Sequence, residues 1–182
     1  MIVARKKRKE NIAEYLLYMW QVEDIIRANH FDMDAIRQTV VSRYGQPEEV
    51  KNEIIRWYEE LVEMMRSEGV MQKGHIRLNT NVVIALTDLH LRLLKSPREM
   101  LYNSAYYKTL PYIVQLRAKS GGEDVPELET CFTAVYGYLI LKMQQKEISA
   151  ETEEAVKQVV SYLSVLAEKY REEQQNELNI EE

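Results

Sequence analysis

Apolar side chains recur at helical spacing along most of the chain, and they are densest between residues 11 and 27. This segment reads NIAEYLLYMWQVEDIIR, and on a helix its apolar positions fall on three separate stripes. A helix that is apolar on every side is normally enclosed by other elements. The pattern therefore predicts that the N-terminal helix, residues 11–27, is the central helix of an all-α fold.

Further segments carry helical periodicity or helix-start residues and complete a single-domain bundle of six to seven helices over residues 1–182. The other predicted helices span residues 32–44, 47–68, 79–95, 96–120, 126–146 and 149–171. The helix at 79–95 is the second heavily apolar one. We expect it to lie inside the bundle with the first, because two such helices can hide their surfaces only against other helices.

Particular residues set the expected helix boundaries and crossings. Asn79 is predicted to cap the helix that follows it, and residues 121–122, both glycine, to end the preceding long helix. Pro111 removes a helical hydrogen bond, so we expect a kink or a break near Thr109. Gly137 is interpreted as the site of a close helix crossing, because glycine otherwise costs about 1 kcal/mol within a helix.

The composition narrows the class of protein. The 182 residues carry a net charge of −5, which argues against a nucleic-acid-binding domain with a basic face. The single cysteine, Cys131, excludes an internal disulfide and a cysteine-based zinc site. No apolar run of signal-peptide type follows the basic start, and the segment at 11–27 is too polar to span a membrane. These features predict a protein of the reducing cytoplasm.

The two ends of the chain are strongly charged. Residues 1–10 form a basic arm, expected as a solvated start, and residues 172–182 an acidic, frayed tail. The arm contains Arg5, Lys6, Lys7, Arg8 and Lys9. These five cations are the one feature that supports contact with RNA, an anionic lipid or an acidic partner.

Two carboxylates interrupt the apolar stripes of the central helix. Glu23 shares a stripe with Leu16 and Ile26, and burying its charge without a partner costs several kcal/mol. Arg27, four residues further on, is the expected partner. The alternative is that Glu23 faces a polar pocket with a shifted pKa.

The stretch RKENIAEYLLYMWQVED, residues 8–24, resembles the start of a family of small bacterial proteins found mainly in the Bacteroidetes group. The family is a domain of unknown function. The resemblance covers most of the chain and implies an all-helical, intracellular protein. It supplies no catalytic or ligand residues.

The catalytic and metal motifs that sequence can reveal are missing. No histidine has a glutamate three residues before it, as helical di-iron sites need, and no phosphate-binding glycine loop is present. We therefore predict no metal and no cofactor, and the missing motifs favour a protein without catalytic activity over an enzyme. The leading hypothesis is a helical interaction or regulatory module, with a protein partner or a second copy of the chain.

The alternative hypothesis is a small-molecule binding protein or enzyme. Its polar pocket would lie between the helices at 11–27, 79–95 and 96–120. Asp88 and His90 point about 200° apart on one helix, so only one of them can face that pocket. The candidate pocket residues are Tyr18, Glu23, Asp24, Arg27, Asp88, His90 and Tyr107.

Overall fold

The computed structural model describes residues 2–120, 125–178 and 180, which contain eight α-helices, one 3-10 helix and no strand. The predicted all-α class is confirmed, with a helix count slightly above six to seven. The helices are α1 (Ile2–Glu10), α2 (Ile12–Ala28), α3 (Met33–Thr39), η1 (Val41–Arg43), α4 (Glu48–Ser67), α5 (Arg77–Lys95), α6 (Met100–Ser120), α7 (Glu127–Met143) and α8 (Ala150–Gln174).

The chain forms two compact units. Unit 1 comprises residues 1–10 and 14–82, and unit 2 comprises residues 11–13 and 83–182. Each unit has its own buried side chains. A single domain over residues 1–182 stays a prediction.

The basic start of the chain is helical, and only Ala4 within it is buried, so the expectation of a solvated arm stays a prediction. Residues 2–10 form α1, and its three cations in the last turn lie where the helix dipole favours positive charge. Lys7 donates to Glu14 at 2.8 Å, and the Arg8 guanidinium lies 5.6 Å from the centre of the Tyr15 ring. Asn11 interrupts the helix and caps α2, since its side-chain oxygen accepts the N–H of Ala13 at 3.0 Å.

The enclosure of α2 is confirmed. Among its 17 residues only Glu14, Asp24 and Ala28 are exposed. Leu16 and Ile26 are fully buried, as the stripe pattern requires. The free energy of burying such a leucine or isoleucine is about 1.5–3 kcal/mol, so this helix contributes a large share of the core.

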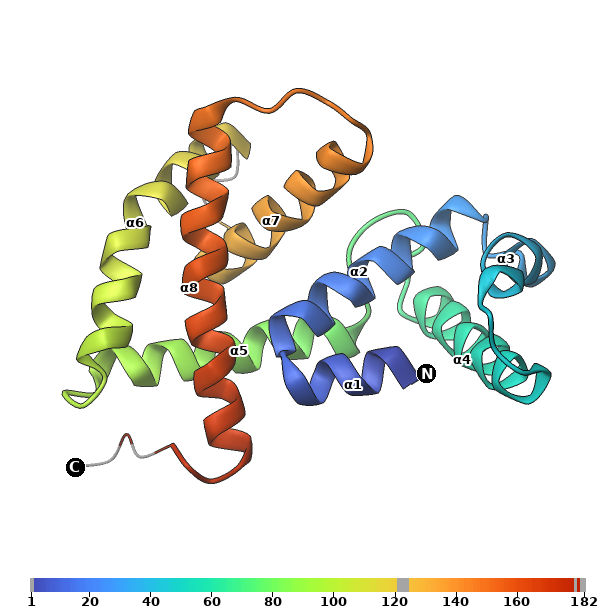
Figure 1. The fold of residues 1–182 in the computed structure, drawn as a ribbon, viewed down its shortest axis with the longest axis horizontal. Coiled ribbons are helices and arrows are strands. Elements are labelled where there is room, and N and C mark those ends of the chain that lie inside the picture. Colours follow the sequence, from blue (N-terminus) through green and yellow to red (C-terminus); the bar gives the residue numbers. More distant parts are fainter. Residues whose placement is uncertain (1, 121–124, 179, 181–182) are drawn as a thin grey trace. The chain divides into compact units, whose positions relative to one another are not determined.

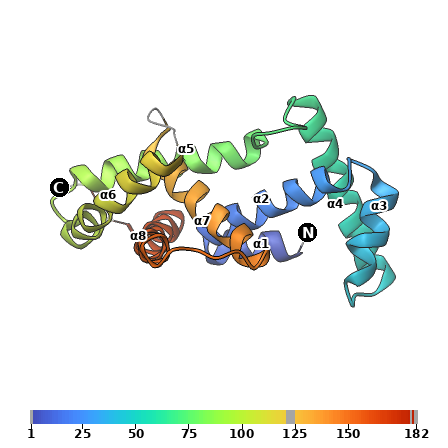
Figure 2. The same cartoon turned by 90° about the horizontal axis from the view of Figure 1, so that it is seen from above.

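The helix predicted at residues 32–44 consists of two pieces, α3 and η1. Asp32 caps α3, accepting the N–H of Asp34 at 2.8 Å. In Figure 2, α3 lies alongside α4, and Arg37 joins the two helices through Glu59 at 3.1 Å. Helix α4 buries one clean stripe of side chains: Ile54, Tyr58, Leu61, Val62 and Met65.

Helix α5 begins at Arg77, two residues before the predicted cap. Asn79 is therefore not an N-cap; it is fully buried inside the first turns of the helix, and its side chain bonds elsewhere. The expectation that this helix lies wholly inside is also wrong. Leu89 is fully buried, whereas Ile84 is 64% exposed and Leu91 49%.

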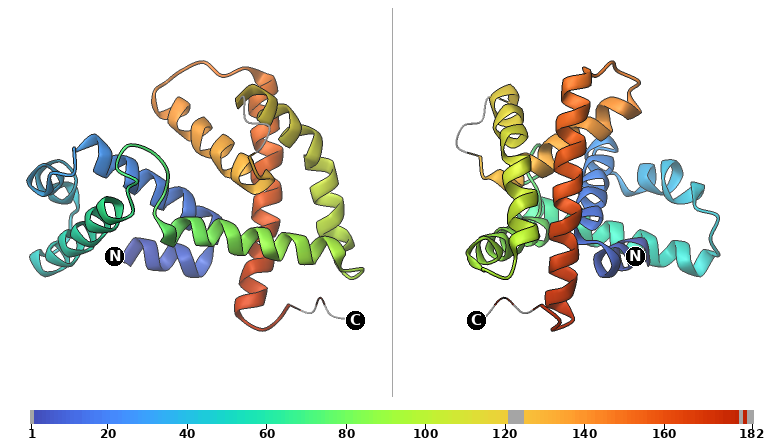
Figure 3. Two further views of the ribbon diagram at one scale, coloured as in Figure 1. Left: turned by 180° about the vertical axis from the view of Figure 1, so that it is seen from behind. Right: turned by 60° about the vertical axis from the view of Figure 1, so that its left-hand side comes forward.

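Unit 2 is built around α8, which packs against both α6 and α7 (Figures 1 and 3). Ser149 caps α8, accepting the N–H of Thr152 at 3.3 Å. Helix α6 runs unbroken through Pro111, so of the kink or break predicted near Thr109 the break is absent, and Figure 1 shows that the helix is bent. Thr109 remains helical and donates its hydroxyl to the carbonyl of Ala105 at 2.8 Å.

Further predictions in unit 2 concerned Gly137, the acidic tail and the glycines at residues 121–122. A Cβ added to Gly137 would meet no atom within 4 Å, so this glycine does not mark a close crossing. The expected acidic tail begins inside α8, where Glu173 accepts from Arg92 at 2.5 Å. The two glycines at residues 121–122 lie outside the described residues.

No helix in the described part of the chain combines the length and apolar character needed to cross a membrane.

Candidate functional site

One face of α2 holds the connection between α4 and α5. Trp20, Glu23, Asp24 and Arg27 are spaced by three, four and seven residues, so they lie on one side of the helix. All of them belong to unit 1, as does the connection at residues 70–76. The polar side chains on this face of α2 therefore contact the connection and the first turn of α5.

Glu23 is the centre of this contact. Its carboxylate is fully buried, and Oε1 accepts the Ile76 N–H at 3.1 Å and the Asn79 side-chain amide at 2.7 Å. Its Oε2 lies 2.5 Å from Nδ1 of His75. Three donors surround one acceptor-only group, which satisfies the charge without a cation from its own helix. The predicted pairing of Glu23 with Arg27 is therefore wrong.

Arg27 instead binds the backbone of the connection between α4 and α5. Its guanidinium donates to Asp24 at 2.8 Å and to the carbonyl of Val70 at 3.1 Å, and it also donates to the carbonyl of Gly74. Gly74 has a φ of 86°, a conformation that favours glycine. Asp24 and Arg27 thus form the intrahelical pair, and Arg27 also binds the connection.

The His75 ring stacks on Trp20, with centroids 4.0 Å apart and planes 7° from parallel. The imidazole is 28% exposed, and within the described residues its only hydrogen bond is to Glu23. A carboxylate that holds Nδ1–H leaves Nε2 as the basic nitrogen. No hydroxyl or thiol of the described chain is bonded to it. Trp20, Glu23 and Arg27 of α2 therefore form an anchor that holds residues 70–76 against this helix.

Tyr18, the remaining candidate on α2, lies apart from this anchor. Burial, with the neighbouring Tyr44 hydroxyl as a smaller cause, raises the pKa of Tyr18 above its ordinary value. The hydroxyl is therefore protonated at neutral pH and acts as a neutral hydrogen-bonding group.

His90, in unit 2, belongs to a buried triangle of hydrogen-bonding groups. Its Nδ1 lies 2.7 Å from the Tyr102 hydroxyl and 2.9 Å from the Tyr162 hydroxyl, and the two hydroxyls lie 2.9 Å apart. Burial lowers the pKa of His90 and raises those of both tyrosines, so all three groups are neutral at pH 7. The triangle joins α5, α6 and α8.

The aromatic cluster continues to the surface through two adjacent tyrosines. Tyr106 sets its ring 4.8 Å from His90 and donates its hydroxyl to Glu127 of α7 at 2.8 Å. Tyr107 packs on the Tyr106 ring at 5.1 Å and is 63% exposed. Asp88 lies on the exposed side of α5 and accepts from Arg92 at 3.1 Å.

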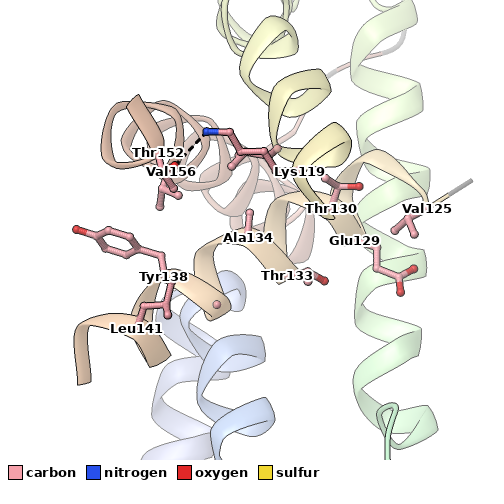
Figure 4. Close-up of a pocket in the computed structure, with 12 residues that line it drawn as sticks. Lys119, Val125, Glu129, Thr130, Thr133, Ala134, Tyr138, Leu141, Thr152 and Val156 are labelled. Carbon is pink, nitrogen blue, oxygen red and sulfur yellow. Dashed lines mark hydrogen bonds between the residues drawn. The ribbon is translucent and has the colours of Figure 1, made fainter. Parts of the chain in front are cut away.

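A groove of about 500 Å³ runs between α6, α7 and α8 of unit 2 (Figure 4). Its apolar wall includes Ala134, Gly137 and Leu141, and its polar lining consists of three threonines together with Lys119, Glu129 and Tyr138. At one end Lys119 reaches across to Thr152, donating at 3.2 Å. The groove contains none of the seven predicted pocket residues.

Helix α6 is apolar on two opposite sides. The inner face is buried in unit 2 and consists of Tyr102, Tyr106, Thr109, Ile113 and Leu116. The outer face follows spacings of four and three residues and is exposed throughout; it consists of Met100, Ser104, Tyr107, Pro111, Val114 and Ala118. Met100 is 74% exposed and Val114 56%, unusual values for apolar side chains that share a stripe.

The structure therefore brings Glu23, Asp24 and Arg27 together in unit 1, and Asp88, His90 and Tyr107 belong to unit 2. Sequence reasoning missed His75, Asn79, the groove and the outer face of α6. The outer face was visible in principle, since two apolar stripes half a turn apart can be read from residues 100–118. Among the described residues, no three His, Cys, Asp or Glu side chains gather as a metal site would require.

Comparison with known proteins gives one match. The model of a family described as a domain of unknown function (DUF4924) matches residues 1–177. No curated protein and no solved structure shows a significant match to the chain.

Proposed function

We propose, for a chain that belongs to the DUF4924 family, that it is a non-enzymatic helical interaction module that binds a protein through the outer face of α6. The observation that carries the proposal is the row of exposed apolar side chains along that face. Exposed apolar stripes of this kind mark sites of association on other proteins. Knobs-into-holes packing of two helices uses the same spacing of four and three residues.

Other features support a binding role over catalysis. Glu23 and His90, the ionisable groups at the centres of the two buried clusters, are each hydrogen-bonded to neighbouring groups. Net charge is −5, and one cation of α1 is bonded to Glu14, which favours a protein partner over a nucleic acid. Cys131 is buried and unpaired, which suits a reducing cytoplasm.

Two methionines of unit 2 provide the test. Met100 on the outer face of α6 is 74% exposed, and Met143 at the end of α7 is 67% exposed. Dilute purified protein should convert both to sulfoxide at similar rates under peroxide. In intact cells that make the protein, Met100 should be oxidised severalfold more slowly than Met143, as read by mass spectrometry. Equal rates in cells would overturn the proposal.

The groove of unit 2 favours a second candidate function, the binding of a small molecule. A volume of about 500 Å³ with an apolar wall and a few hydroxyls falls within the range of ligand pockets. A Gly137→Leu variant would fill the groove, because nothing lies within 4 Å of an added Cβ. A fragment that raises the melting temperature of the wild type and not of this variant would support the second candidate. Equal shifts for both proteins would remove it.

A further inference from the structure

We infer that the occupant of the outer face of α6 is a second copy of this chain, packed antiparallel about a two-fold axis at residue 109. This inference rests on the proposed function and names its partner. It comes from the order of large and small side chains along the face, which is self-complementary when one helix is reversed.

The pairing follows from the spacing. Positions 100, 104, 107, 111, 114 and 118 alternate intervals of four and three, which is the a/d pattern of a coiled coil. Reversing a second helix about residue 109 places Tyr107 of one copy against Pro111 of the other. It also places Met100 against Ala118 and Val114 against Ser104. In every layer a larger side chain meets a smaller one, which is how facing helices interdigitate without voids.

A parallel arrangement lacks this fit. In register it would set Ala118 against Ala118 and Ser104 against Ser104, leaving gaps, while two Tyr107 rings competed for one layer. Voids and overpacked layers both cost stability. The order of residues therefore selects the antiparallel orientation.

The residues that flank the stripe differ on its two sides. On one side, Leu110 of each copy meets Leu110 of the other close to the two-fold axis. On the opposite side, Lys108 meets Lys108, and α6 contains no acidic residue to neutralise them. The apolar contact favours association and the lysine pair opposes it, so association should strengthen as salt screens the lysines.

The area is sufficient for a reversible dimer. Met100, Leu101, Tyr107 and Val114 expose between 56% and 88% of their surfaces. Two copies would together remove roughly 1,000 Å² or more from water, the lower limit of specific interfaces. We therefore expect a dissociation constant on the order of 10 µM.

Disulfide trapping tests orientation and register together. The native Cys131 is fully buried, and burial raises the pKa of its thiol to about 12, so it stays unreactive. A Leu110→Cys chain should form a covalent dimer under mild oxidation, because the two introduced thiols meet at the axis. A Met100→Cys chain should not, since its thiols lie at opposite ends of the dimer. A 1:1 mixture of Met100→Cys and Ala118→Cys chains should again cross-link.

Charge reversal at Lys108 provides an independent test of the antiparallel dimer. A mixture of wild-type and Lys108→Glu chains should favour the mixed dimer about threefold over the statistical expectation, because an opposite pair replaces two like pairs. Sedimentation of tagged chains at low salt reads this ratio, and circular dichroism confirms that each variant is folded.

The remaining outcomes separate this inference from the proposed function. Cross-linking by Met100→Cys and not by Leu110→Cys would overturn the antiparallel arrangement. A wild-type chain that stays monomeric at several hundred micromolar while Met100 is protected in cells would assign the face to another protein, and the proposed function would stand. Protection of Met100 by anionic vesicles in place of a second copy would overturn both.

Discussion

Replacing Glu23 by alanine and by glutamine should show how much its hydrogen bonds and how much its charge contribute to the free energy of unfolding. A Glu23→Ala change leaves the Ile76 N–H and the Asn79 amide buried without acceptors and opens a cavity in α2. Each orphaned donor costs about 1–3 kcal/mol, so the free energy of unfolding should fall by roughly 4 kcal/mol. The Glu23→Gln change should cost only about 1 kcal/mol, because the amide oxygen still accepts both bonds and the amide nitrogen donates to the other tautomer of His75.

Urea denaturation at pH 7 measures both losses, with Glu14→Gln as the matched control on the exposed side of the same helix. The control should change stability by less than about 0.5 kcal/mol. Amide hydrogen exchange at Ile76 localises the effect, since Glu23→Ala should release residues 70–76 before the rest of unit 1 unfolds. Equal losses for the alanine and glutamine variants, or a loss for alanine no larger than the control, would refute the reasoning.

Three further changes are predicted from the same structure. Burial lowers the pKa of His90 below 6.5, so the unfolded chain binds more protons and stability should fall as the pH drops below about 6.5. His90→Gln should flatten this slope in denaturation curves from pH 7 to 5. Gly137→Ala should raise stability by about 0.5–1 kcal/mol, because the added Cβ meets no atom within 4 Å and the helix gains propensity; an unchanged or lower melting temperature would contradict this. Gly74→Ala should cost about 1 kcal/mol or more, because its φ of 86° strains a side chain, and calorimetry should show the loss.

The all-α fold and the enclosure of α2 could be predicted because they depend on local periodicity. A helix that is apolar on every side is buried regardless of which elements pack against it. Leu16 and Ile26 are fully buried as expected. Caps were also predictable where the capping residue acts on its own helix, as Ser149 does. The predicted cap at Asn79 is wrong because the side chain of Asn79 instead donates to the buried carboxylate of Glu23 on another helix.

The partners of Glu23 could not be predicted, because they lie more than fifty residues further along the chain. Local reasoning supplies Arg27 as the nearest cation on the same helix. Arg27 is instead drawn to the carbonyls of residues 70 and 74, which a chain turning at glycine presents together. Only the tertiary course of the connection decides between these arrangements.

The two faces of α6 show a different limit. Pro111 was expected to kink or break the helix. The helix continues through it, and Pro111 lies on the exposed outer face, where the lost hydrogen bond disturbs no packed neighbour. The structure also separates two adjacent tyrosines of this helix, with Tyr106 turned inward and Tyr107 outward.

The central claim is that the outer face of α6 contributes nothing to the fold and is covered by a partner. The most direct measurement is the oxidation rate of Met100 relative to Met143 in cells, for wild type and for Val114→Glu. The account predicts that the variant keeps the wild-type free energy of unfolding within about 0.5 kcal/mol, while Met100 becomes as reactive as Met143. A variant that unfolds, or one whose Met100 remains protected, would contradict it.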